Sequence, residues 1–210
     1  APVDKHGSSI DSLFNILHFP AALNRAAVDG GSITYTSYRA FGDSASAPYV
    51  NQYLARRDSG QGWTTEPISP ERRGPSLMTF GSVNLDRQYK AFTSDLCSGF
   101  VVQDADPVLA PEASEGYPGL YRRDNCGTGT GAYEALSVPE PPATVPPNLP
   151  PNKFIPEPQG ISADGSVTIF TVGDNLTPDA PPQPPACENE PEPGVEACES
   201  RLYEATGGQV

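Results

Sequence analysis

One short sequence pattern recurs three times along the chain and restricts the fold more than any other feature. In each copy an aspartate is followed six residues later by an aromatic residue and then by threonine. The copies begin at Asp29, Asp86 and Asp164. Glycine follows the aspartate in the first and third copies, which is typical of a tight turn, and β-branched or aromatic residues come next, as in strands. We therefore expect the three aspartates to form the turns of a repeated hairpin rather than to act as catalysts.

Two further patterns follow the first one in the same order. The second begins at Tyr53, Gly119 and Arg201, and the third occupies Trp63–Ser69 and Tyr133–Ser137. This order predicts a four-stranded antiparallel meander that is used three times. The spacing between copies is unequal, but the extra residues fall in one loop and one connector, as repeat proteins tolerate.

The third copy carries a family resemblance. Its Ser-Ala-Asp-Gly sequence at 162–165, its Phe170-Thr171 and its later Leu202-Tyr203 resemble the TolB-type, WD-like β-propeller repeat of large secreted (actinobacterial-like) proteins of high-GC soil bacteria. The resemblance implies an all-β fold of antiparallel four-stranded blades. About three blades form an incomplete ring, since propellers usually close with four to eight. A β-sandwich is the alternative, because short strands with turns serve both architectures. The family implies a fold and no activity.

The repeat divides the chain into five parts. An N-terminal segment, 1–24, is expected to hold a short helix over Ser9–Phe19. Three repeat units follow at 25–74, 75–138 and 160–210, the last with an incomplete outer strand. Residues 139–159 are rich in proline and predict a stiff polyproline connector, in preference to a ligand for an SH3-like groove.

The four cysteines indicate an oxidising compartment. They are Cys97, Cys126, Cys187 and Cys198. Their spacing does not favour zinc, and of three possible pairings the local one, Cys97–Cys126 with Cys187–Cys198, is favoured. An even cysteine count is typical of extracellular proteins, so we expect the protein to be secreted or at the cell surface. Four reduced thiols in a cytosolic protein are the alternative.

The charge of the chain excludes some partners. It has 26 acidic and 13 basic residues, a formal net charge of -13, and a polyanion such as nucleic acid repels an acidic chain. No run of 18 apolar residues occurs, so no membrane-spanning segment is expected.

No catalytic, cofactor or metal site is expected. His6 and His18 lie in the N-terminal segment, outside the repeats, where neither suits base-assisted nucleophilic catalysis. Asp104 and Asp106 have a spacing that calcium sites use, but the other ligands are absent and a solvated acidic loop is favoured.

Two arginine pairs, at 56–57 and 122–123, are expected to be exposed strand residues paired with acidic neighbours. A binding rim for an anionic glycan is the alternative for them.

These observations predict a non-catalytic extracellular module with a structural or interaction role. Its expected partners are another protein or further copies of the chain, which would complete a ring or a cell-surface assembly. The alternative is a glycan-binding module or part of a carbohydrate-active enzyme, with a glycan as partner.

Overall fold

The computed structural model describes residues 24–37, 42–44, 51–58, 60, 62–71, 79–80, 83–84, 88–103, 107–115, 117–138, 155–173, 175–180 and 200–207. Within these residues the chain forms strands and no helix, and every strand pair is antiparallel. The expected all-β antiparallel fold is therefore confirmed. The expected helix over Ser9–Phe19 and residues 139–154 of the proline-rich connector lie outside the described residues.

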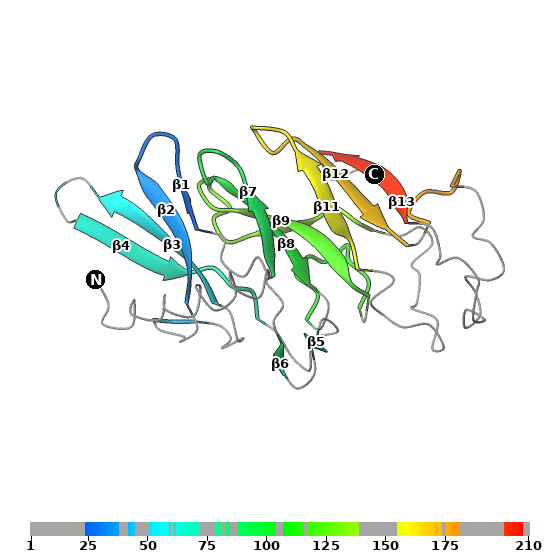
Figure 1. Ribbon diagram of the computed structural model, residues 1–210, viewed down its shortest axis with the longest axis horizontal. Helices are drawn as coiled ribbons and strands as arrows, with labels where there is room; N and C mark the ends of the chain where they lie inside the picture. Colours follow the sequence, from blue (N-terminus) through cyan, green and yellow to red (C-terminus); the bar gives the residue numbers. More distant parts are fainter. Residues whose placement is uncertain are drawn as a thin grey trace.

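The strands form three meander sheets and one small hairpin (Figure 1). The first sheet contains β1 (Arg25–Ala26), β2 (Ser32–Ser37), β3 (Asn51–Asp58) and β4 (Gly62–Pro67). The middle sheet contains β7 (Tyr89–Phe92), β8 (Ser98–Gln103), β9 (Gly119–Asp124) and β10 (Tyr133–Ala135). The third sheet contains β11 (Glu157–Ile161), β12 (Val167–Val172) and β13 (Arg201–Thr206). The hairpin pairs β5 (Thr79–Phe80) with β6 (Val83–Asn84).

The three sheets follow one another in a row, each facing the next (Figure 1). Between the first and middle sheets one apolar cluster is buried, and it includes Leu54, Ile68, Tyr89 and Val101. Between the middle and third sheets a second cluster is buried, and it includes Phe100, Leu120, Leu136, Phe170 and Tyr203. Successive residues of a strand point to opposite faces, so the middle sheet is covered on both of its faces.

The burial of the strands reflects this arrangement. In the middle sheet, β8 carries the consecutive apolar residues Phe100, Val101 and Val102, all fully buried. In the third sheet, β12 alternates, with Thr168, Phe170 and Val172 buried and the residues between them partly exposed. A strand covered on two faces needs a continuous apolar run, whereas one covered on a single face needs apolar residues only at alternate positions.

Candidate functional site

Three hairpin turns of the same construction lie at one end of the sheets (Figure 1). They connect β1 to β2, β7 to β8 and β11 to β12, and each places an aspartate third in a five-residue connection: Asp29, Asp95 and Asp164. In each turn the aspartate accepts a hydrogen bond from the backbone N–H two residues later, at 2.8, 2.9 and 3.0 Å respectively. The next residue has a positive φ, as a hairpin with a one-residue bulge requires.

The turn of the middle sheet belongs to Asp95, and sequence reasoning missed it. Asp86 itself lies outside the described residues, while the strand that contains Phe92 is β7, which occupies the position of β1 and not of β2. The first pattern of the middle copy is thus displaced by one strand, while its second and third patterns lie on β9 and β10, at the positions of β3 and β4. The signal was hidden because Leu96, with φ 62°, stands where the other two turns have Gly30 and Gly165, with φ 70° and 73°.

Leu96 adopts the left-handed backbone because burial compensates for it. A non-glycine residue at positive φ is strained by roughly 1–2 kcal/mol. The Leu96 side chain is 1% exposed and packs in the cluster between the first and middle sheets. Complete burial of a leucine contributes about 1.5–3 kcal/mol, which equals or exceeds that strain.

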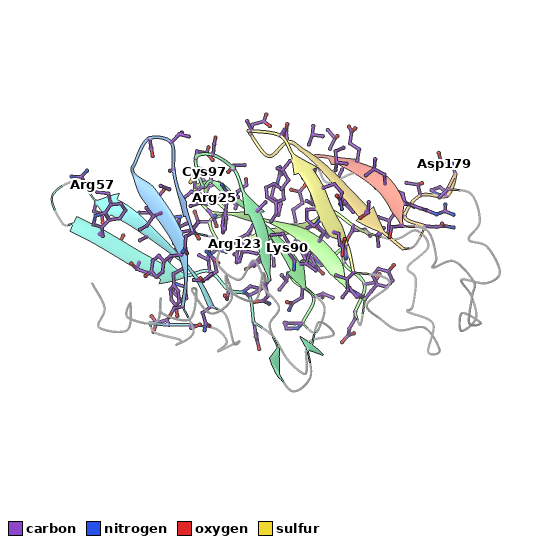
Figure 2. All side chains as sticks on the ribbon, viewed as in Figure 1. Arg25, Arg57, Lys90, Cys97, Arg123 and Asp179 are labelled. Carbon is purple, nitrogen blue, oxygen red and sulfur yellow. A yellow bond between two sulfur atoms is a disulfide. The ribbon has the colours of Figure 1, made fainter. Side chains whose placement is uncertain are left out.

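A disulfide joins Cys97 to Cys126, as in the local pairing that the sequence favours. It links the β7–β8 turn to the segment after β9, and Figure 2 places Cys97 at the end of the sheets where the hairpin turns lie. Between the two cysteines, Asn125 donates its backbone N–H to the carbonyl of Cys97 and its side-chain amide to the carbonyl of Leu96, both at 2.9 Å. The second expected pair, Cys187–Cys198, lies outside the described residues.

The carboxylates at this end are held in their ionised form. Hydrogen bonds from the Ser162 hydroxyl and from Ser166 lower the pKa of Asp164 to about 2. The backbone N–H of Cys97, with the Thr93 hydroxyl, lowers the pKa of Asp95. The pKa of Asp124 is lowered in the same way by the backbone N–H groups of residues 127 and 126. Each carboxylate therefore serves as an acceptor that fixes a turn, and none has the raised pKa of a general acid.

Two arginines connect each sheet to the next one. Arg56 pairs with Glu66 at 2.6 Å and also donates to the carbonyl of Asn125 in the middle sheet. Arg122 pairs with Glu134 at 2.5 Å and donates to the carbonyl of Gly165 in the third sheet at 3.1 Å. Both therefore pair with acidic neighbours, as expected, and both also bridge two sheets.

The prediction that all four arginines are exposed is wrong, because Arg56 and Arg122 are half-buried and Arg123 is buried. Arg123 is 7% exposed and donates to the side chain of Asn125. Of the four arginines in the two pairs, only Arg57 is exposed.

The described part of the chain offers no candidate metal centre. Within it, no group of three or more His, Cys, Asp or Glu residues is placed to hold a metal ion. His6, His18, Asp104 and Asp106 lie outside the described residues. The described ranges also contain no helix that could cross a membrane.

Tyr89 and Tyr121 are buried in the packing of the middle sheet. The Tyr89 hydroxyl donates to the carbonyl of Ile68 at 2.6 Å, which joins the middle sheet to the first, and burial raises its pKa well above the ordinary value. Burial also raises the pKa of Tyr121 to about 12. These hydroxyls therefore stay protonated at neutral pH.

The third sheet packs against the middle sheet with one face, and its other face differs from the corresponding faces of the first two sheets. On the first two sheets, the face that points along the row is covered by the next sheet. On the third sheet no further sheet of described residues covers the corresponding face, which we call the open face. Its residues are Val167, Ile169, Thr171, Leu202, Glu204 and Thr206.

The exposure of one leucine shows the contrast. Leu202 of β13 is 67% exposed on the open face, whereas Leu120 of β9, at the same register in the middle sheet, is fully buried. Among the described residues, the row of sheets therefore ends in a face that carries a leucine at the position of the buried Leu120, and this face is the candidate interaction site. No family model matches the chain, and neither a curated protein nor a solved structure matches it.

Proposed function

We propose that the chain is a non-catalytic extracellular structural or interaction module whose sheets are successive blades of a β-propeller. A sandwich packs two sheets together and leaves one face of each outside. Here a middle sheet is covered on both faces by neighbours of the same meander topology, which supports blades over a sandwich. The Cys97–Cys126 disulfide is consistent with an oxidising compartment.

The open face carries the proposal that this module associates with another chain, first of all with a further copy of itself. Two sheet-to-sheet contacts already exist within the chain, and each buries the face that corresponds to the open face. The open face places the exposed Leu202 on the same side as the partly exposed Val167 and Ile169, and apolar side chains gathered on one face favour association with a partner. A neighbouring sheet would remove Leu202 from water as Leu120 is removed.

The native mass in solution tests this proposal. The 22.2 kDa chain is expected to form oligomers, and Leu202→Lys is expected to shift them towards the monomer, measured by analytical ultracentrifugation. Val28→Lys is the matched control, because Val28 is 79% exposed in the β1–β2 turn, away from the open face. A wild-type chain that stays monomeric at all accessible concentrations, or equal effects of the two variants, contradicts self-association.

A glycan-binding role is the second candidate, and one observation favours it. Trp63 is 48% exposed on β4 and lies directly across from the exposed Arg57 of β3. An exposed indole beside a guanidinium presents an apolar face and a positive charge together, which suits an anionic sugar.

Tryptophan fluorescence tests the glycan role cleanly, because the chain contains a single tryptophan. Titration with acidic polysaccharides is expected to change the emission of Trp63, and Arg57→Ala is expected to weaken that response. An unchanged spectrum contradicts glycan binding at this place, and release of sugar products contradicts the non-catalytic assignment.

A further inference from the structure

In the first two sheets the fourth strand is attached by the same pair of hydrogen bonds. In the first sheet, Ile68 donates its N–H to the carbonyl of Gln52 at 2.9 Å, and the Gln52 N–H donates to Ser69 Oγ at 2.8 Å. In the middle sheet, Leu136 donates to the carbonyl of Leu120 at 2.8 Å. The N–H of Leu120 donates to Ser137 Oγ at the same distance. An aliphatic residue followed by serine thus fixes the end of both fourth strands.

The register of the third sheet puts Leu202 at the same point. In each sheet the residue six positions after the turn aspartate (Tyr35, Val101 or Phe170) lies across from a tyrosine of the next strand. These tyrosines are Tyr53, Tyr121 and Tyr203. The residue just before that tyrosine is Gln52, Leu120 or Leu202. Because backbone groups alternate along a strand, the N–H and carbonyl of Leu202 point away from β12, as those of Gln52 point towards β4.

This edge of β13 is unpaired among the residues that the structure describes. There, β13 pairs with β12 alone. Leu202, Glu204 and Thr206, whose backbone groups point to this edge, are all exposed. An exposed row of N–H and carbonyl groups is a template for the addition of another strand.

The side chains of β13 determine which charge an added strand should carry. Glu66 lies across from Leu54, and Glu134 lies across from Arg122, to which it is paired. At the same register β13 has Glu204, so an acidic residue on an added strand would face a like charge. Opposite charges across neighbouring strands are favourable and like charges are unfavourable.

We propose that the open edge of β13 binds an extended antiparallel peptide segment with the pattern basic residue, any residue, aliphatic residue, serine. The N–H of the aliphatic residue donates to the Leu202 carbonyl, the serine hydroxyl accepts from the Leu202 N–H, and the basic side chain pairs with Glu204. This inference rests on the proposed interaction function, because it names the chemistry of the partner at the same end of the molecule.

A labelled peptide with the sequence of residues 62–69 and Glu66→Lys tests the inference against the full chain by fluorescence anisotropy. This peptide is expected to bind about threefold more tightly than the peptide that retains Glu66. The chain variant Glu204→Lys is expected to reverse this preference. An N-methyl group on the peptide nitrogen of Ile68 is expected to weaken binding about tenfold, because the donor to Leu202 is lost.

The matched control is an N-methyl group on Thr65 of the peptide. Just after β4 the N–H of Ile68 points to β3, so the N–H of Thr65 in β4 points to the outside, and its methylation is expected to have little effect. In the complex, hydrogen exchange is expected to slow at Leu202, Glu204 and Thr206. Absence of binding, equal effects of the two N-methyl groups, or slowed exchange only elsewhere would overturn the inference.

These outcomes are separable from the failure of self-association. If the chain is monomeric but binds the peptide at β13, the inference stands and the proposed self-association is wrong. If the chain forms oligomers that depend on Leu202 but the peptide does not bind, self-association stands and the inference is wrong.

Discussion

The middle and third sheets are built from the same turn and the same strand order, yet they differ in how many neighbours they have. The middle sheet is buried on both faces, and the third sheet is buried on one. Accordingly β8 is apolar at consecutive positions, while β12 alternates apolar and polar environments. The place of a sheet in the row therefore determines how its strands are buried, whereas its hairpin turn has the same construction in both places.

Truncation of a core aromatic in the middle sheet is the strongest test of this comparison. Phe100→Ala is expected to lower the free energy of unfolding by about 3–5 kcal/mol, because Phe100 is fully buried between the middle and third sheets. Leu202→Ala, on the open face, is expected to change the same quantity by no more than about 0.5 kcal/mol. Urea unfolding measures both, and similar losses would show that the two faces are equally covered.

Removal of the disulfide is expected to have the next largest effect. Cys97 and Cys126 are 29 residues apart, and a cross-link over a loop of this size restricts the unfolded chain by about 3–4 kcal/mol. The double variant Cys97→Ser, Cys126→Ser is expected to lose about that much stability in urea. If its midpoint matches that of the wild type under non-reducing conditions, the bond is not formed in the protein in solution.

Leu96 tests whether the middle turn is equivalent to the other two. Leu96→Ala removes the packing and keeps the positive-φ strain, whereas Leu96→Gly removes both. Glycine is therefore expected to be the less damaging of the two, by about 1 kcal/mol. This order is opposite to the usual one in strands and helices. A larger loss for glycine in thermal or urea unfolding would mean that the turn is not left-handed at Leu96.

Acidification is expected to give the smallest effect. The pKa of Asp164 in the folded protein is about 2, below its ordinary value near 3.8. Its hydrogen bonds therefore stabilise the fold fully at pH values above about 3.8. This stabilisation is lost as the pH falls from 4 towards 2. Asp164→Asn is expected to show a flatter dependence of unfolding free energy on pH over that range. Parallel curves for the two proteins would exclude a role for the ionised carboxylate.

Much of the strand order could be predicted from the sequence because it depends on local chemistry. The turns at Asp29 and Asp164 have glycine after the aspartate, and both occupy the hairpins that this chemistry predicts. The turn at Asp95 could not be recognised, because a buried leucine replaces the glycine and an unrelated match of the spacing exists at Asp86.

The contacts between sheets were beyond the reach of local patterns. Whether Arg56 lines a surface or bonds to Asn125 depends on how two sheets face each other. The exposure of Leu202 likewise depends on the number of sheets in the row, since Leu120 has similar strand neighbours and is fully buried.

The disulfide has a consequence for how the chain withstands proteases. Residues 104–118 connect β8 to β9 and lie entirely between Cys97 and Cys126. A protease that cuts this connection once therefore leaves the two fragments linked through the cysteines. The nicked protein would migrate as one species without reductant and as two with it, and its three sheets would remain tethered in their original order.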